Sequence, residues 1–554
     1  MVSSLCYWRT TMARDRLLAG GAIWTLDPTV GVAEAIALRD GKVLAVGNNA
    51  EVRAAISADY DYIDLAGRSV IPGICDAHIH LLWSALLADQ IDLQEVASFE
   101  QALEIIRRHA ERLPADAWVL GSGWDHSLWQ RDWPTASELD QVTGGRPAFI
   151  TRKDLHSAWV NNVALQRANI SKFSSDPDGG SIGRDSAGEP NGMLFENGQL
   201  AVKACIPEPS NAQKEASIQT FIKRMHRRGI TSLHVPEGPD CFAAVQALYG
   251  RGALEMRILH HLRMDLLDHA VAMGLKSGLG DAWLRFGNLK IFSDGSLGSA
   301  TAHMLTPFDN LPANAPHPYG IPMLDREDLF ATIDRAIAND ISVIVHAIGD
   351  AANRTVLDAI EAAIKANPET LRPSLDTGPV AARIPNRIEH AQVLHPDDIR
   401  RFGQLGVIAS MQPIHATSDI TLADRLWGQR SQYAYAWRSL QASGAILAFG
   451  SDAPVESWDP WAGLQAAVTR QRPDATPAGG WYPEQCLSLN EALWAYTVGP
   501  AITSGEQAFK GSLSVGKLAD LVILDQDLAQ VANDQVAKVQ VAQTIIEGQT
   551  VWEG

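Results

Sequence analysis

Residues 69–80 read SVIPGICDAHIH, a mostly apolar run that ends in two histidines separated by one residue. Apolar residues on both faces are typical of strands buried inside a parallel sheet. The spacing of His78 and His80 places both imidazoles on the same face of such a strand. We therefore predict a buried strand that carries two metal-capable side chains at its carboxyl end.

Seven further segments share this pattern, and helical stretches such as residues 326–340 and 353–367 lie between several of them. Eight strands with intervening helices predict an α/β protein built as a (β/α)8 TIM barrel. A doubly wound open sheet is the alternative, but no glycine-rich phosphate-binding motif follows any strand. The seven segments are GITSLHVPE (229–237), MRILHHLR (256–263), LKIFSDG (289–295), ISVIVHAIGD (341–350), NRIEHAQ (386–392), GVIASMQPIH (406–415) and AILAFGSDAP (445–454).

The two ends of the chain and one long gap do not belong to this repeating pattern. Both ends contain short alternating strand-like segments, including a predicted hairpin around Asp40-Gly41. About 150 residues separate the first two barrel strands, whereas one βαβ unit takes roughly 30. The predicted divisions are a leader of unknown role (1–11), a small β-sandwich (12–69 and 506–554), the barrel (70–84 and 216–505), and an insertion or lid (85–215).

Composition excludes several classes of protein. Apolar residues make up 46% of the 554-residue chain, enough for a large buried core, which excludes disorder. The net charge of −18 disfavours nucleic acid and anionic membrane as partners. The apolar runs are shorter than the roughly 18 residues of a membrane-spanning helix. An odd number of scattered cysteines without a CxxC motif predicts reduced thiols and a cytoplasmic location; they are Cys6, Cys75, Cys205, Cys241 and Cys486.

Residues with metal-ligand chemistry recur near the carboxyl ends of the predicted strands. In a barrel these ends converge on one mouth, where active sites are built. Four imidazoles and a carboxylate suit Zn²⁺, with Mn²⁺, Fe²⁺ or Co²⁺ also possible. Singly, each residue has a structural explanation, but the ordered set indicates a metal site. The set is His78, His80, Lys290, His346, His390 and Asp452.

The same segments resemble the amidohydrolase superfamily, specifically its amidohydrolase-3 branch, which contains N-substituted formamide deformylases. The resemblance covers nearly the whole chain after Met12. Its matching segments are VIPGICDAHIHL (70–81), LHSAWVNNVAL (155–165), GEPNGMLFE (188–196), LKIFSDGSLGSATA (289–302), VIVHAIGDAAN (343–353), RIEHAQV (387–393), SMQPIHATSD (410–419), FGSDAPV (449–455) and GSLSVGKLADLVILD (511–525).

The resemblance implies a centre of two divalent metal ions, most simply zinc. It implies that His78 and His80 bind the more buried ion, and that His346 and His390 bind the more exposed one. Lys290 would carry a CO₂-derived carbamate that bridges the ions. Asp452 would bind the more buried ion and shuttle protons. The implied activity is hydrolysis of a non-peptide C–N bond by a metal-bridging hydroxide, in an amide, N-substituted formamide or carbamate.

Other residues are candidates for contacts with the substrate or with the metal ligands. Gln412, His415 and Asp294 are expected at the mouth, although Asp294 could equally cap the turn Asp294-Gly295. Trp83 lies three residues after His80, and the insertion contributes GSGWDHSLW (121–129), with Trp124 and Asp125.

Tryptophans near the mouth favour a small apolar or aromatic substrate. The alternative is that they pack the insertion's own core, which we expect more for Trp118 and Trp159 than for Trp83, Trp124 or Trp129.

Three functional hypotheses follow, of which a binuclear amide hydrolase is preferred. A mononuclear deaminase, or an ester, lactone or carbamate hydrolase of the same superfamily, is the second; a deaminase would not need Lys290. A catalytically silent scaffold or regulator is the third, but such relatives have lost ligands, whereas all six are kept here. A small-molecule substrate is the expected partner, and a homodimer is left open.

Overall fold

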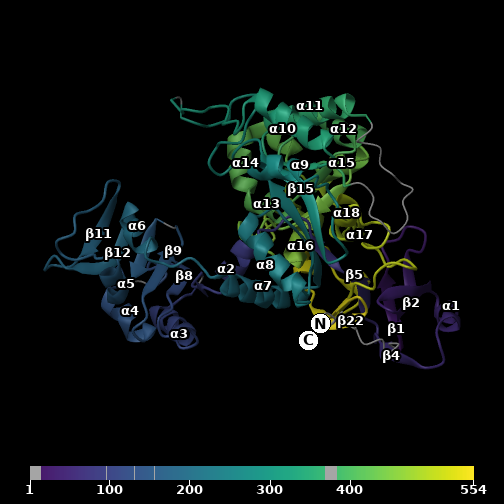
Figure 1. The fold of residues 1–554 in the computed structure, drawn as a ribbon, viewed down its shortest axis with the longest axis horizontal. Coiled ribbons are helices and arrows are strands. Elements are labelled where there is room, and N and C mark those ends of the chain that lie inside the picture. The colour runs from purple at the N-terminus through teal and green to yellow at the C-terminus, as the bar shows by residue number, and fades with distance from the viewer. Residues whose placement is uncertain (1–13, 95, 130, 155, 313, 369–383) are drawn as a thin grey trace, which may run out of the picture. The chain divides into compact units, whose positions relative to one another are not determined.

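The computed structural model describes residues 14–94, 96–129, 131–154, 156–312, 314–368 and 384–554 (Figure 1). The chain forms two compact units: Met1–Leu82 with Gln219–Gly554, and Trp83–Ile218. The divisions fall inside two helices, α2 (Leu81–Ala88) and α7 (Asn211–His226).

The larger unit contains an eight-stranded, all-parallel barrel sheet, so the predicted α/β TIM barrel is confirmed. The last strand lies beside the first, where the backbone N–H of Ala77 donates to the carbonyl of Phe449 at 3.0 Å. In sheet order the strands are β6 (Ile74–Asp76), β13 (Ile230–Val235), β14 (Arg257–Arg263), β15 (Leu284–Phe292), β16 (Val343–Ala347), β17 (Arg387–His390), β18 (Ile408–Met411) and β19 (Leu447–Phe449).

The first predicted strand, residues 69–80, is divided in the structure. Its first part, β5 (Ser69–Pro72), joins the terminal sheet, and only β6 belongs to the barrel. The break lies at Gly73, where a Cβ atom would come within 2.3 Å of the Thr231 hydroxyl oxygen. The backbone must pass close to Thr231 at this point, which only glycine permits. His78 and His80 consequently follow the strand rather than lie within it.

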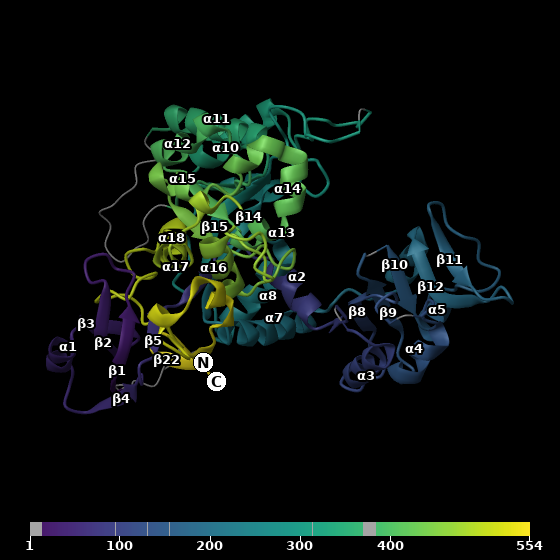
Figure 2. The ribbon, with the colours of Figure 1, turned by 180° about the vertical axis from the view of Figure 1, so that it is seen from behind.

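Segments from the two ends of the sequence lie side by side in one hydrogen-bonded sheet, visible in purple and yellow (Figure 2). Asp40 and Gly41 both have positive φ, as the predicted β2–β3 hairpin turn requires. Leu18, Ile36, Leu521 and Ile545 share its core. The path is β22 (Gln549–Glu553), β21 (Val541–Ile546), β20 (Leu521–Leu524), β5, β1 (Asp15–Trp24), β2 (Val32–Arg39) and β3 (Lys42–Gly47), with β4 (Tyr60–Asp64) paired to β1.

Helices surround the barrel strands, and α10 and α11 occupy the two helical stretches named from the sequence (Figure 1). None of the described helices is both long and apolar enough to cross a membrane. The helices of the larger unit beyond those above are α1 (Asn49–Ala55), α8 (Pro239–Gly250), α9 (Leu267–Ala272), α10 (Arg326–Ala338), α11 (Asp350–Ala366), α12 (Pro396–Leu405), α13 (Pro413–Ser418), α14 (Ile420–Trp427), α15 (Trp437–Ala442), α16 (Pro460–Thr469), α17 (Leu489–Ala495) and α18 (Val498–Thr503).

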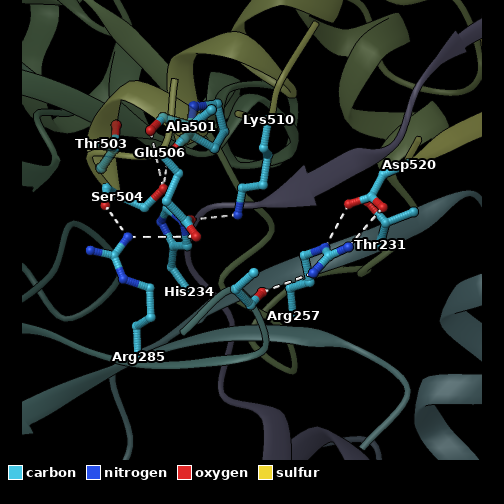
Figure 3. A network of polar contacts seen from close by, with 12 residues as sticks. Thr231, His234, Arg257, Arg285, Ala501, Thr503, Ser504, Glu506, Lys510 and Asp520 are labelled. Carbon is cyan, nitrogen blue, oxygen red and sulfur yellow. Dashed lines mark hydrogen bonds and ion pairs between the residues drawn. The ribbon is translucent and has the colours of Figure 1, made fainter. Parts of the chain in front are cut away.

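Charged residues at the amino ends of the barrel strands connect the barrel to the C-terminal part of the chain (Figure 3). Arg257, the first residue of β14, donates to both carboxylate oxygens of Asp520 at 2.6 and 3.0 Å. Glu506 pairs with Lys510 at 2.6 Å and with Arg285 at 3.5 Å. These side chains are almost completely buried, so their charges are balanced inside the protein.

The smaller unit is a mixed sheet with its own aromatic core. Trp124, Trp129 and Trp159 lie within 6.4 Å of one another, measured between ring centroids, and Phe99 packs against two of them. The sheet order is β11 (Gly180–Arg184), β12 (Pro190–Glu196), β10 (Ser157–Val160), β9 (Ala148–Arg152), β8 (Val119–Trp124) and β7 (Ile91–Asp92), and the helices are α3 (Phe99–Ala110), α4 (Ala136–Thr143), α5 (Asn162–Arg167) and α6 (Leu200–Lys203).

Candidate metal centre

The predicted metal ligands lie at or just beyond the carboxyl ends of the barrel strands. His346 is in β16, His390 is the last residue of β17, and Asp452 follows β19. His390 and Asp452 both have positive φ, 73° and 59°. This backbone conformation costs a non-glycine residue roughly 1–3 kcal/mol, which the surrounding structure must compensate.

One carboxylate brings the first two histidines together. The Oδ1 atom of Asp452 lies 3.4 Å from Nε2 of His78 and 3.2 Å from Nε2 of His80. The ligand atoms of the three residues all lie within 4.8 Å of one another. The backbone N–H of Asp452 donates to the carbonyl of His78 at 2.7 Å, which holds the two loops in register. The arrangement can hold one cation.

The same carboxylate belongs to a second group of possible ligands, with His390 and His415. The His346 ring lies 4.5 Å from the His390 ring, measured between centroids, and is therefore adjacent. Its Nε2 atom is 2.9 Å from the carbonyl of Gly295, which leaves Nδ1 available to a ligand. His415, considered from the sequence only for a role beside the ligands, thus offers a ligand atom itself.

Lys290 lies on β15 and is almost completely buried beside this cluster. Its Nζ atom is 4.6 Å from the centroid of the Phe292 ring. Burial lowers the pKa of the Lys290 ammonium to about 8, although the carboxylates of Glu389 and Asp452 act to raise it. A substantial neutral fraction of the amine therefore exists near neutral pH.

Burial also keeps the imidazoles in the form that binds metals. Desolvation lowers the pKa of His346 to about 4 and lowers the pKa values of His78 and His390 below their ordinary range. Burial by itself would raise the pKa of Asp452, but the hydrogen bond from His80 and the surrounding imidazoles hold it well below its usual value. At neutral pH the cluster thus presents neutral imidazoles at His78, His346 and His390 and an ionised carboxylate at Asp452.

Residues outside the predicted set orient two of the imidazoles. Nδ1 of His78 lies 2.5 Å from Oε2 of Glu389, and Glu389 is paired with Nε of Arg387 at 2.7 Å. Nδ1 of His390 lies 2.9 Å from Oε1 of Gln412. Gln412 was a candidate from the sequence, but Glu389 and Arg387 were missed. Their signal is two charged residues of opposite sign at alternate positions of a predicted buried strand, which places both side chains on the same face.

Asp294 organises the loops beside His346. Its carboxylate accepts three backbone N–H groups, from His303 at 2.9 Å, Ile348 at 3.0 Å and Gly349 at 2.9 Å. Its Oδ1 atom is 3.6 Å from Nε2 of His346. Burial raises the pKa of Asp294 to about 7, against the effect of the three N–H groups. Of the two roles considered from the sequence, the structure favours the one in which Asp294 caps loops.

A pocket of about 680 Å³ opens beside Lys290 and His80 at the carboxyl end of the barrel. Phe292, Met264 and Met323 line it and expose part of their surfaces to solvent. Besides Lys290 and His80, its acidic and basic lining residues are Glu237, Asp240, Asp265 and Arg263, and the last two form an ion pair. Apart from Lys290, the pocket therefore combines apolar walls with a basic residue, Arg263, that is already paired.

Trp124 and Asp125, the candidate substrate contacts in the insertion, make their described contacts with other residues of the smaller unit. Trp124 is as fully buried as Trp159 and donates its indole N–H to the carbonyl of Ile150 at 2.8 Å. The expected distinction between these two tryptophans is therefore wrong, since both are core residues. Asp125 is buried and pairs with Arg152 and Lys153. Trp83, on α2, is half exposed.

A barrel whose strand ends gather histidines and an aspartate around one point defines a metal-dependent hydrolase, and comparison with known proteins agrees. The model of the amidohydrolase family matches residues 61–552, so the chain belongs to this family, as the sequence predicted. It is similar to the uncharacterised metal-dependent hydrolase of Pyrococcus furiosus in a crystal structure. The TM-score is 0.72 and the identity 28%, over 93% of this chain and 99% of that one.

Relatives of known name extend along nearly the entire chain. Protein LONG AFTER FAR-RED 3 of Arabidopsis thaliana is 32% identical, over 94% of this chain and 90% of its own. The putative amidohydrolase YtcJ of Bacillus subtilis is 30% identical, over 96% and 98%. N-substituted formamide deformylase of Arthrobacter pascens is 27% identical, over 97% and 98%. The chain is accordingly a hydrolase of the metal-dependent amidohydrolase family.

Proposed function

We propose that this enzyme hydrolyses a non-peptide C–N bond in a small neutral amide, N-substituted formamide or carbamate. The observation that carries the proposal is the position of Asp452, whose carboxylate belongs to both groups of possible ligands. A carboxylate at this point can serve both as a ligand and as the group that moves protons. We also propose a cytoplasmic location, because scattered cysteines without a CxxC motif favour reduced thiols.

The donor set suits two divalent cations, and zinc is our first choice. Neutral imidazoles with a carboxylate are ligands for Zn²⁺, and also for Mn²⁺, Fe²⁺ or Co²⁺. His78, His80 and Asp452 would hold one ion, and His346 and His390 the other. When bound, such ions lower the pKa of water and polarise a carbonyl group.

Lys290 would complete the site as a carbamate. The neutral amine adds to CO₂, forming an N–C bond and releasing one proton, and the product is an anion that can lie between two cations. The lowered pKa of Lys290, about 8, supports this step because only the neutral amine reacts. A lysine left as an ammonium group would instead repel both ions.

Asp452 would transfer the proton during hydrolysis. In this mechanism its carboxylate accepts a proton from the attacking water and returns it to the leaving nitrogen as the C–N bond breaks. The hydrogen bond from His80 and the surrounding imidazoles hold its pKa well below the usual value, so the carboxylate is ionised at neutral pH. His415, with Nε2 3.8 Å from Asp452 Oδ2, is our candidate for a donor to the developing oxyanion.

The pocket supports an apolar or aromatic group on the substrate. Phe292, Met264 and Met323 offer partly exposed apolar surface within reach of a group seated beside His80 and Lys290. The name of the formamide deformylase relative agrees with the proposed bond type. An anionic substrate fits less well, because Arg263 is already paired with Asp265.

Metal analysis combined with a substrate screen tests the proposal. We expect two divalent ions per chain, loss of activity on chelation, and turnover of an aryl amide, formamide or carbamate. Lys290→Ala should lose metal and recover partly when a short carboxylic acid replaces the carbamate. One ion per chain with a fully active Lys290→Ala variant would instead indicate a mononuclear enzyme, and deamination in the screen would indicate a deaminase.

A further inference from the structure

The ligand histidines differ in the groups that hold their second ring nitrogen. His78 is held by a carboxylate, because Oε2 of Glu389 lies 2.5 Å from its Nδ1 atom. A carboxylate can only accept a hydrogen bond, so Nδ1 carries the proton and Nε2 is the free ligand atom. That Nε2 atom faces Asp452 at 3.4 Å.

The other two histidines with described anchors are held by neutral oxygens. His390 donates through Nδ1 to the side-chain amide oxygen of Gln412 at 2.9 Å. His346 donates through Nε2 to the backbone carbonyl of Gly295, also at 2.9 Å. Both arrangements orient the ring through a neutral acceptor. The Asp294 carboxylate lies 3.6 Å from Nε2 of His346, beyond hydrogen-bond distance.

The charge on Glu389 is built firmly into the barrel. Its other oxygen lies 2.7 Å from Nε of Arg387, and no surface of either side chain is exposed. Arg387 also donates to the carbonyl of Ala77 at 3.2 Å, one residue before His78. The ion pair therefore joins the strand that carries His390 to the loop that carries His78.

A carboxylate behind a ligating imidazole increases its basicity more than a neutral acceptor does. Removing such a partner typically weakens metal binding 10- to 100-fold. His78 should therefore be the strongest imidazole ligand of the centre. The position formed by His78, His80 and Asp452 gains from it, whereas the position formed by His346 and His390 does not.

We propose that the two cation positions are unequal because Glu389 backs only the first of them. The His78 position fills first and keeps its ion, and the His346–His390 position fills second and exchanges. This inference rests on the two-ion centre of the proposed function. Glu389 and Arg387 are positioning residues in this account, and they do not contact the substrate.

Zinc titration of the metal-free full-length chain against a chromophoric chelator tests the inference. The unchanged protein should bind in two steps of different affinity. Glu389→Gln should weaken the tighter step about 10- to 100-fold and leave the weaker step within a factor of three. Melting of the metal-free variant checks its folding separately.

The reciprocal substitution provides the matched variant. Gln412→Glu places a carboxylate behind His390, and should tighten the weaker step by a similar factor without changing the tighter one. Among the described atoms, Nε2 of Gln412 is buried without a hydrogen-bond partner, so the exchange sacrifices no contact made by that nitrogen. This variant remains informative if Glu389→Gln fails to fold.

The outcomes separate the inference from the proposed function. Equal steps in the unchanged protein, or a Glu389→Gln effect confined to the weaker step, would overturn the inference while leaving a two-ion enzyme. Unchanged affinities in both variants would overturn it as well. A chain that binds no zinc, or a single ion, would refute the two-ion centre itself.

Discussion

The two ends of the barrel use buried charge in opposite ways. At the amino end, Arg257 is matched by Asp520, and Glu506 by Lys510, so each charge has a partner within the chain (Figure 3). At the carboxyl end, Asp452 faces the imidazoles of His78 and His80, and burial lowers the pKa of His78. Negative charge is thus balanced by protein groups at one end and left to balance a cation at the other.

Because of this difference, we expect the buried charges at the amino end to stabilise the fold and those at the carboxyl end to serve the reaction. A buried ion pair strongly destabilises the protein when one partner is removed, because the remaining charge has no compensation. A ligand cluster is different, because a bound cation from outside the chain supplies the charge that balances it. Changes at the amino end should therefore affect folding, and changes at the carboxyl end should affect turnover.

The largest effect is expected at the carboxyl end, from Asp452→Asn. The amide cannot accept the proton, so kcat should fall by about 10²- to 10⁴-fold. His78 and His80 should keep metal bound, and the metal-free variant should melt close to the parent. Steady-state kinetics with metal analysis checks this, and a fully active, metal-loaded variant would show that Asp452 is not the proton shuttle.

At the amino end, Asp520→Asn should reduce the free energy of unfolding by about 3–5 kcal/mol. The guanidinium of Arg257 is almost completely buried and would lose its bidentate partner. Denaturant unfolding measures the loss, and the folded variant should keep its metal content. Lys365→Gln is the control: its ion pair with Glu361 is on the surface, so it should cost less than about 1 kcal/mol.

The smallest of the three effects concerns His226, the last residue of α7. It is a buried titratable group that, unlike the buried charges at the amino end of the barrel, is not in an ion pair among the described residues. Among the described residues neither ring nitrogen has a hydrogen-bond partner, and burial lowers its pKa from 6.5 to about 4. The unfolded chain therefore takes up this proton near pH 6.5 and the folded chain only near pH 4. Stability should fall as pH decreases between these values.

His226→Leu should remove this part of the acid sensitivity. The difference in unfolding free energy between parent and variant should change by about 3 kcal/mol between pH 7 and pH 4, from 1.36 kcal/mol per pKa unit. Denaturant unfolding of the metal-free proteins at several pH values provides the measurement. Parallel pH dependences would show that His226 does not titrate differently in the folded state.

The sequence predicted the barrel because strands buried in a parallel sheet appear as short, mostly apolar runs separated by helical stretches. It also predicted that the candidate metal ligands meet at the carboxyl end of the barrel, since the carboxyl ends of barrel strands converge. Glu389 was missed because its contact with His78, 311 residues away, forms only in the folded chain. Trp124 was misplaced because an indole near a predicted mouth and one in a core look alike in sequence.

Sequence by itself determined the class of this protein: the order of its strands, its family, and the residues able to bind metal. The strands follow from local periodicity and the metal-capable residues from their chemistry, whereas the family follows from the motifs that the chain shares with it. Only the tertiary structure decided where the first strand divides at Gly73, which carboxylate joins the ligand groups, and which imidazole has a charged anchor. Those features depend on distances of a few ångströms between residues far apart in the chain, and packing alone sets them.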